Sequence, residues 1–231
     1  MSTFKTYLNS SIGKKQVVAV SGVALVIFII LHLIGNLLIF KGPELFNTYA
    51  HALHSMGRLL QVMEIGLFLT FSVHIIFTIA LIIENKNARG RAYAVTKNKN
   101  RSFATQTMRY TGPLVLFFLI LHLLDFTWSA PWPKTSIVNG QDLATYGMVF
   151  NALLNPMRAV VYIAAVCSLG FHLSHGVQSV FQSFGVVSAS RPGPIRTISK
   201  GLGYIIAIGF SSIPLYINYI HYSGALLCHL Q

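Results

Sequence analysis

The sequence predicts an all-α, polytopic membrane protein with five transmembrane helices. Of its 231 residues, 54% are hydrophobic and only 10% are charged, and the mean hydropathy is +0.62. An average soluble domain carries about 25% charged residues. Apolar runs long enough to cross about 30 Å of hydrocarbon recur along the whole chain, so residues 1–231 are predicted to form a single membrane domain. The predicted spans are residues 17–40, 59–83, 110–128, 156–181 and 201–222.

Each span is bounded by residues that suit a membrane surface. Span 1 contains no charge and is followed by the turn signal Gly42-Pro43. Its apolar run is longer than the core of a signal peptide, about 7–15 residues, so it is predicted to stay in the protein. Span 3 ends at Trp128, a residue typical of the interface. Span 4 begins with Pro156, whose missing N–H does no harm in a first helical turn. The only interruption of span 2 is Glu64.

The net charge of +12 is distributed unevenly between the two sides of the predicted membrane. Most basic residues lie before span 1, between spans 2 and 3, or between spans 4 and 5. The connections on the other side contain only Lys41, Arg58, Lys134 and Arg158. Because cytoplasmic loops carry the excess of Lys and Arg, the N-terminus is predicted to be cytoplasmic and the C-terminus outside.

Four of the predicted spans each contain a histidine within an apolar run. By helical rise, His32 and His122 lie roughly 22 Å and 18 Å from the inner starts of their spans, in the outer half of the bilayer. His74 and His172 lie roughly 22–24 Å below the outer starts of theirs, in the inner half. Two pairs of imidazoles stacked across a membrane are what two haem groups with closed six-coordination would require, and the expected role is electron transfer.

Other roles for these histidines stay open. A buried histidine can also act as a hydrogen bond between membrane helices. His175 lies one turn after His172 and is a rival ligand. The fifth span has no histidine in its middle, and we expect it to pack at the periphery of a four-helix core that holds the haems.

Several motifs together resemble a known family. The pattern Ser11-x-Gly13-Lys14-Lys15 continues to Ser21-Gly22 and His32-Leu33-Ile34-Gly35-Asn36. Gly42-Pro43-Glu44-Leu45-Phe46-Asn47 and Phe171-His172-Leu173-Ser174-His175-Gly176 follow. With Glu64, His74 and His122, these segments resemble the five-helix, two-haem cytochrome b subunit of succinate:quinone oxidoreductases. This family includes succinate dehydrogenase and quinol:fumarate reductase.

The resemblance implies a cofactor set and partners. It implies two b haems, one held by His32 and His122 on the outer side and one by His74 and His172 on the inner side. It also implies an FAD-containing flavoprotein and an iron–sulfur subunit on the cytoplasmic face of a bacterial cytoplasmic membrane. The quinone it implies is a low-potential one such as menaquinone. Some relatives carry a glutamate two positions before the last haem ligand, where this chain has Gly170.

Charged residues near the membrane surfaces are predicted to serve the cofactors. Glu64 can exchange protons with a quinone, although it can equally reach the headgroups or pair with Arg58. The same two interpretations apply to Asp125, one turn beyond His122: it can exchange protons with a quinone, or it can contact headgroups or a basic side chain. Haem propionates are anionic, so cations and hydroxyls near them are candidate partners. These are Lys14, Lys15 and Ser21 on the inner side and Arg58 and Arg158 on the outer side.

Two alternative functions follow from the same residues. The first is the cytochrome b of a hydrogenase or formate dehydrogenase, which also passes electrons to quinone. The second is a haem-free transporter whose buried histidines relay protons or bind a transition metal. In any of these cases the chain is expected to have no dicarboxylate chemistry of its own, because nothing in it could hold a flavin or an iron–sulfur cluster.

Overall fold

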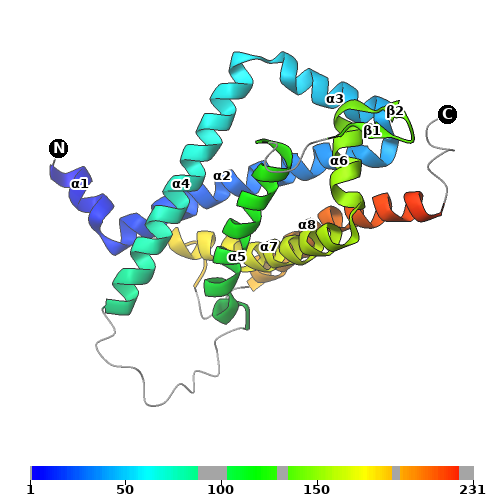
Figure 1. Ribbon diagram of the computed structural model, residues 1–231. Helices are drawn as coiled ribbons and strands as arrows, with labels where there is room; N and C mark the ends of the chain where they lie inside the picture. The colour runs from blue at the N-terminus through cyan, green and yellow to red at the C-terminus, as the bar shows by residue number, and fades with distance from the viewer. Residues whose placement is uncertain (1, 88–102, 129–134, 189–192, 224–231) are drawn as a thin grey trace.

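The computed structural model describes residues 2–87, 103–128, 135–188 and 193–223, and most of them are helical (Figure 1). The helices are α1 (Ser2–Asn9), α2 (Ser11–Leu37), the 3-10 turn η1 (Leu38–Lys41), α3 (Pro43–Ser55), α4 (Arg58–Asn87), α5 (Phe103–Phe126), α6 (Ala144–Leu154), α7 (Pro156–Ser183) and α8 (Gly193–Tyr222). Two short antiparallel strands, β1 (Ile137–Val138) and β2 (Gln141–Asp142), form a hairpin before α6. Most of the basic loop between spans 2 and 3, and the C-terminal residues 224–231, lie outside the described residues.

In the described part of the chain, four helices are long and apolar enough to cross a membrane. They are α2 with η1, α4, α7 and α8. The part of α5 from Tyr110 to Phe126 is equally apolar but shorter. Several helices extend beyond the predicted spans: α2 begins at Ser11, where the Ser10 side chain caps the helix by accepting from Gly13 N–H at 3.0 Å. Pro156 occupies the first turn of α7, as its position predicts.

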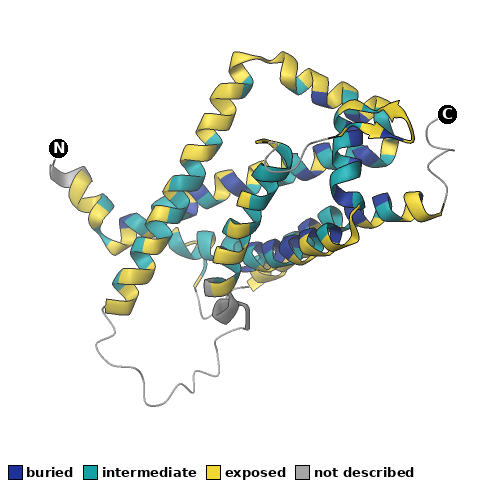
Figure 2. Cartoon of the chain, in the orientation of Figure 1, coloured by how far each residue is buried: buried dark blue, intermediate teal, exposed yellow. Residues whose placement is uncertain are grey.

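The closest helix packing lies between α7 and α8. Gly170 and Gly203 face each other there, and a Cβ at Gly170 would lie 2.5 Å from the Gly203 carbonyl oxygen. Small residues of this kind let two helix backbones approach closely. Ile206, Ile213, Ile217 and Ile220 of α8 are buried against the neighbouring helices (Figure 2). Helix α8 is therefore a central packing element, which differs from the prediction of a peripheral fifth helix.

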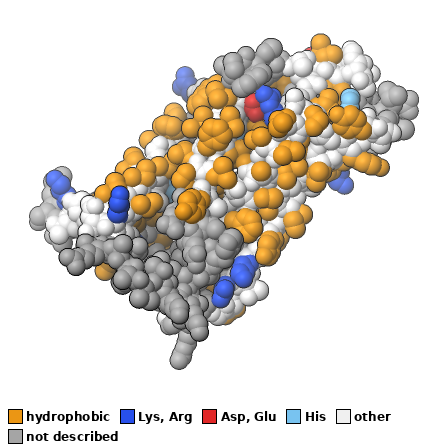
Figure 3. Space-filling view, turned by 60° about the horizontal axis from the view of Figure 1, so that its bottom comes forward, with side chains coloured by type: hydrophobic (Ala, Val, Ile, Leu, Met, Phe, Trp, Pro, Cys, Tyr) orange, Lys and Arg blue, Asp and Glu red, His pale blue; other side chains and the backbone are white. Residues whose placement is uncertain are grey.

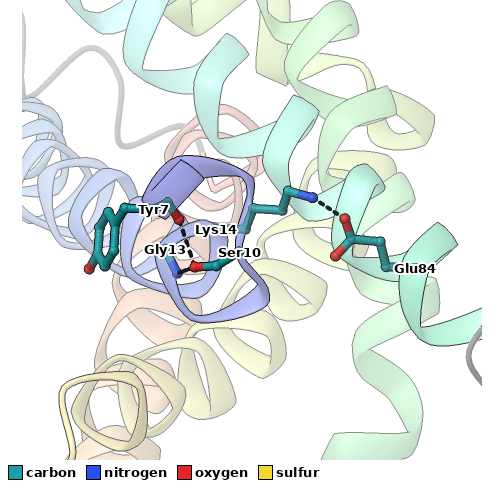
Figure 4. Close-up of polar contacts among 5 residues, drawn as sticks. All are labelled: Tyr7, Ser10, Gly13, Lys14 and Glu84. Carbon is teal, nitrogen blue, oxygen red and sulfur yellow. Dashed lines mark hydrogen bonds and ion pairs between the residues drawn. The ribbon is translucent and has the colours of Figure 1, made fainter. Parts of the chain in front are cut away.

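The peripheral helix in this chain is α4. It packs mainly against α2, leans away from α7 and α8 (Figure 1), and none of its described residues is buried. An ion pair between Lys14 of α2 and Glu84 joins the two helices near their predicted cytoplasmic ends (Figure 4). Apolar side chains such as Val62, Phe68 and Ile76 of α4 are exposed. They add to the largely apolar exterior that a lipid-facing chain requires (Figure 3).

A small cap covers one end of the long helices. It consists of α3, the β1–β2 hairpin and α6, and it lies at the opposite end of the molecule from α1 (Figure 1). Ile39, Phe46, Tyr146 and Phe150 form its apolar core. The two predicted outer connections, residues 41–58 and 129–155, thus meet at one end, as the alternation of spans requires. The sequence predicts them as polar, turning segments and does not predict their helices.

Candidate histidine-pair sites between the membrane helices

The first site lies between α2 and α5, where His32 and His122 face each other. Their ring centroids are 5.8 Å apart and their planes are nearly perpendicular, at 87°. Two imidazoles on opposite sides of one metal ion need about 6 Å between their centres, because each metal–nitrogen bond is about 2 Å long. The separation of this outer pair fits such an arrangement.

Aromatic side chains hold the outer pair from several helices. Phe28 stacks on His32 with a centroid distance of 5.3 Å, and Phe210 of α8 approaches the same ring at 5.8 Å. Phe118, Phe126 and Tyr162 surround His122 at centroid distances of 5.9, 5.1 and 6.3 Å. The Nδ1 atom of His122 is buried and has no hydrogen-bond partner among the described residues. The site is thus an aromatic cage around two imidazoles, with one polar neighbour, the Asn36 amide, 3.4 Å from Nε2 of His32.

The second site brings α4 and α7 into contact with α2 and α5. His74 of α4 lies with its Nδ1 atom 3.1 Å from Ser21 Oγ on α2. His172 of α7 lies with its Nδ1 atom 3.3 Å from Thr111 Oγ1 on α5. Each inner histidine therefore lies beside a hydroxyl of a neighbouring helix.

These two sites suit a planar metal cofactor better than a bare metal ion. A bare transition-metal ion in a protein usually takes about four protein ligands. In the described parts of the chain, no group of three or more His, Cys, Asp or Glu side chains could hold one. A pair of facing imidazoles fills the two axial positions of an iron whose other four ligands belong to a haem. The donor set and spacing of the outer pair therefore fit a haem.

His175 lies one turn beyond His172 on α7. It is buried, its Nε2 atom has no partner among the described residues, and it lies near Arg196 and Lys200 of α8. His51, His54 and His221 are exposed at the cap end of the chain. The structure thus favours His172 over His175 as the residue that faces the inner site.

A polar network lies next to the outer pair. The Tyr162 hydroxyl donates to Asp125 Oδ2 at 2.7 Å, and Arg158 Nη2 lies 3.6 Å from Asp125 Oδ1. The Asp125 side chain is only 7% exposed. A cavity of about 310 Å³ opens beside this network, between α5 and the start of α7. Its lining is Leu121, Asp125, Asn155, Met157, Arg158, Val161 and Tyr162.

The remaining predicted site residues lie apart. Glu64 is exposed on α4, Lys15 is exposed on α2, and Arg58 is exposed at the start of α4. Ser21 is buried against His74, where it does not face the membrane surface. Thr111 and Tyr162 are absent from the sequence-based predictions. Each is a polar side chain within an apolar helix, and that is the signal by which they could have been found.

The fold and the two sites define a class: a helical membrane protein with one facing pair of histidines and two further histidines between its helices, each beside a hydroxyl. No family model and no solved structure matches the chain. Among curated proteins, the chain is similar to the succinate dehydrogenase cytochrome b558 subunit of Bacillus subtilis (strain 168). The two are 27% identical over 189 residues, which cover 82% of this chain and 86% of the relative. This similarity confirms the resemblance to the cytochrome b anchors of succinate:quinone oxidoreductases.

Proposed function

We propose that this chain is the membrane-anchor cytochrome b subunit of a succinate:quinone oxidoreductase. It carries electrons across the membrane between an iron–sulfur subunit and quinone. The observation that carries the proposal is the outer histidine pair, with ring centroids 5.8 Å apart inside an aromatic cage. The contacts of His74 and His172 with hydroxyls of neighbouring helices, and the similarity to a cytochrome b558, support it.

The four histidines would hold the cofactors. His32 and His122 would bind the iron of one b haem, and His74 and His172 that of another. When bound, each haem would supply a one-electron carrier. With two imidazoles for each iron, these residues would reserve the cofactors for electron transfer.

The membrane arrangement follows from the charge pattern. Helix α5 also spans the membrane, as the third span in chain order. With α2, α4, α7 and α8 it gives five spans in a bacterial cytoplasmic membrane. The N-terminus is cytoplasmic and the cap of α3, the hairpin and α6 is outside, because the basic connections lie at the opposite ends of the spans. The cytoplasmic face docks the FAD-containing flavoprotein and the iron–sulfur subunit, and the inner pair is nearest to them.

Two carboxylates are candidates for proton exchange with quinone, the proposed substrate, which is menaquinone by resemblance. Glu64 is exposed on α4 and can meet a quinone that arrives through the lipid. Asp125 lies beside a cavity of about 310 Å³ and receives a hydrogen bond from Tyr162. Reduction of a quinone consumes two protons, and a positioned acid accelerates such transfer by about 10²–10⁴-fold.

Separate variants distinguish the two carboxylates. We expect Glu64→Gln to lower quinone turnover about 100-fold with both haems present if Glu64 is the proton donor. If Asp125 is the proton donor instead, Asp125→Asn should lower quinone turnover to the same extent. The measurement is succinate-dependent quinone reduction in membranes, with haem content determined in the same sample. Unchanged turnover in Glu64→Gln would remove Glu64 from the mechanism.

The cations near the surfaces are proposed to neutralise haem propionates to different extents. Lys15 and Arg58 are exposed and could reach an anionic group. Arg158 already lies beside Asp125, and the Ser21 oxygen already contacts His74. Lys15 and Arg58 are therefore the better propionate partners of the four.

The test of the proposal is a reduced-minus-oxidised visible spectrum of the purified chain with a haem-to-protein ratio. We expect two low-spin b haems. His32→Ala and His122→Ala should remove the same one, and His74→Ala and His172→Ala the other. His221→Ala, an exposed histidine, serves as the matched control and should leave both haems in place.

The same preparation separates the alternatives. A chain without a visible haem band would be no cytochrome, and the proton-relay or metal transporter would take its place. A cytochrome that co-purifies with hydrogenase or formate dehydrogenase subunits would belong to those complexes. Co-purification with a flavoprotein that oxidises succinate or reduces fumarate is the expected result.

A further inference from the structure

Helices α2 and α5 present the same dipeptide to the two inner histidines. In each case a hydroxyl residue is followed by glycine: Ser21-Gly22 on α2 and Thr111-Gly112 on α5. The hydroxyl oxygens lie 3.1 Å and 3.3 Å from Nδ1 of His74 and His172. Both inner histidines therefore meet a hydroxyl through the same ring nitrogen.

The direction of the hydrogen bond at His74 follows from its neighbours. A serine hydroxyl has one proton to donate, and that of Ser21 points to the Val17 carbonyl at 2.8 Å. The Val18 carbonyl lies 3.2 Å from the same hydroxyl and is a second acceptor for that proton. With its proton directed at carbonyls of its own helix, the Ser21 hydroxyl meets the ring through its oxygen, so the ring is the donor. Nδ1 of His74 carries the proton, and the Ser21 oxygen accepts it.

The arrangement at His172 is similar. The Thr111 hydroxyl bonds back to the Met108 carbonyl at 3.3 Å, as threonines in helices commonly do. Its oxygen is then free to accept from Nδ1–H of His172. A histidine that donates from Nδ1 has its other nitrogen, Nε2, unprotonated and available to bind a metal.

The glycines leave room for the rings. A Cβ added at Gly22 would lie 3.4 Å from Cε1 of His74, and one at Gly112 would lie 3.7 Å from Cε1 of His172. Only the first side-chain carbon would fit without contact closer than van der Waals distance. A larger side chain at either position would push the imidazole away from the hydroxyl beside it.

The spacing along the two helices repeats. His32 follows Ser21 by 11 positions, and His122 follows Thr111 by 11 positions. Eleven residues make about three helical turns, so the hydroxyl and the histidine lie on the same face of each helix, about 16.5 Å apart along the axis. Helices α2 and α5 thus perform equivalent tasks. Each offers an outer imidazole and an inner hydroxyl on the face that meets the sites.

We propose that Ser21 and Thr111 are positioning residues that fix the tautomer and ring orientation of His74 and His172 for binding the inner haem iron. The binding of an iron at this site rests on the proposed function, whereas the two hydrogen bonds do not. No hydroxyl holds Nδ1 of His122 at the outer site, where this atom has no partner among the described residues, and His32 instead contacts the Asn36 amide through Nε2 at 3.4 Å. The two sites therefore differ in how their ligands are oriented.

The test compares hydroxyl removal with hydroxyl retention. Ser21→Ala and Thr111→Ala remove the acceptors, whereas Ser21→Thr and Thr111→Ser keep them. Ser72→Ala on α4 and Ser168→Ala on α7 are matched controls, because these hydroxyls bond only to their own helices, at Phe68 and Ala164. The readouts in isolated membranes are the midpoint potential and the low-spin ferric EPR g value of each haem, and the rate of haem loss.

In the alanine variants we expect the potential and the g value to shift for one haem only, the one removed by His74→Ala. Loss of that haem should be about 10–100-fold faster, the usual effect of deleting a partner of a metal-bound histidine. The hydroxyl-retaining variants and both controls should match the wild type. Wild-type values for both haems in Ser21→Ala and Thr111→Ala would overturn the proposal, as would equal shifts in both.

A second measurement keeps the two proposals distinguishable. Nitrogen-15 NMR of the histidine rings reports which nitrogen carries the proton, with or without a cofactor. If the wild-type chain contains no haem but His74 and His172 are protonated at Nδ1, the proposed function fails while the hydrogen bonds stand. If Nδ1 of both rings is unprotonated, the positioning role is wrong whether haem is present or not.

Discussion

At the level of single residues, Tyr162 connects the outer site to a buried charge. Its ring packs edge-on against Phe118 and Phe126 of the cage around His122, and its hydroxyl donates to Asp125 at 2.7 Å. Arg158 lies 3.6 Å from the same carboxylate. The Asp125 side chain is largely shielded from the surroundings, so each of these partners matters to its stability.

Tyr162→Phe should therefore destabilise the protein while leaving the aromatic cage in place. A hydrogen bond to a buried charged group is worth about 2 kcal/mol, which corresponds to a fall of about 4–8 °C in the unfolding temperature. The measurement is thermal unfolding in detergent. Tyr219→Phe, at a tyrosine of α8 with 67% of its surface exposed, is the control. An equal change in both variants would show that the Asp125 bond contributes nothing specific.

The sequence identifies the four histidines but not what they touch. His32, His74, His122 and His172 interrupt apolar runs, and a polar side chain within an apolar span is visible without a structure. The contacts of His74 with Ser21 and of His172 with Thr111 depend on how two helices are rotated about their axes. That rotation is set by packing between distant segments, which no single stretch of sequence contains.

At the level of elements, the crossing of α7 and α8 depends on Gly170. A Cβ there would lie 2.5 Å from the Gly203 carbonyl oxygen and 2.8 Å from the Ala207 Cβ. At the position of Gly170, some members of the family that the chain resembles carry a glutamate. The backbone of α8 occupies the space that such a side chain would need, so a proton route through this position is closed in the present packing.

Gly170→Ala should accordingly separate α7 from α8 and lower the unfolding temperature. Forcing an extra carbon into a well-packed contact costs about 1–3 kcal/mol, which corresponds to a fall of about 2–12 °C. Gly176→Ala on the same helix is the matched control, because a Cβ there would meet nothing within 4 Å. Thermal unfolding of the two variants side by side is the measurement. Equal stability of the two variants would mean that the close approach of α7 and α8 contributes nothing.

Besides its apolar core, the outer cap is linked by the side chain of Asn47 of α3. Its Nδ2 donates to the Leu143 carbonyl at 3.0 Å, and its Oδ1 accepts from Tyr146 N–H at 2.9 Å. The two bonds bridge segments almost a hundred positions apart. They also satisfy the backbone at the start of α6, where the helix has no side-chain cap of its own.

Asn47→Ala should loosen the cap, and so should Asn47→Asp, because aspartate keeps the acceptor for Tyr146 but turns a carboxylate oxygen toward the Leu143 carbonyl, where no donor is left. Each lost bond is worth about 1 kcal/mol. Hydrogen exchange at the amides of Tyr146 and its neighbours measures the effect as faster exchange. Thr48→Ala, next in the chain but bonded to its own helix at Glu44, is the control. Slow exchange in Asn47→Ala would contradict the bridge.

The cap also shows where sequence-based prediction of elements ends. Gly42-Pro43 marks a turn, and Gly42 indeed adopts a φ of 92°. The segments after it were expected to be irregular because they are polar and lie outside the spans. Helices α3 and α6 form because Phe46, Tyr146 and Phe150 bury against each other and against α8, a stabilisation that arises only once the long helices are assembled.

At the level of the whole molecule, α4 is positioned within this chain mainly by α2. None of its described residues is buried, and its contacts to α2 include the Lys14–Glu84 ion pair. The described residues of α5 are likewise not buried, and α5 packs mainly against α7. A cofactor or a partner subunit in contact with α4 or α5 would therefore add to a packing that rests chiefly on one neighbouring helix.

Enzyme fusions can test the topology of the whole chain. If α2, α4, α5, α7 and α8 all cross, alkaline phosphatase fused after Gly140 or Ser223 should be active, and fusions after Asn87 or Gly185 should be inactive. The enzyme needs disulfides that form only outside the cytoplasm. The basic residues that flank the predicted inner ends favour this orientation over its reverse. The fusion after Gly140 is the sharpest test, because the described apolar part of α5 is shorter than the other spans. Inactivity there with activity after Gly185 would mean that α5 does not cross, and His122 could then not face His32 at the outer depth.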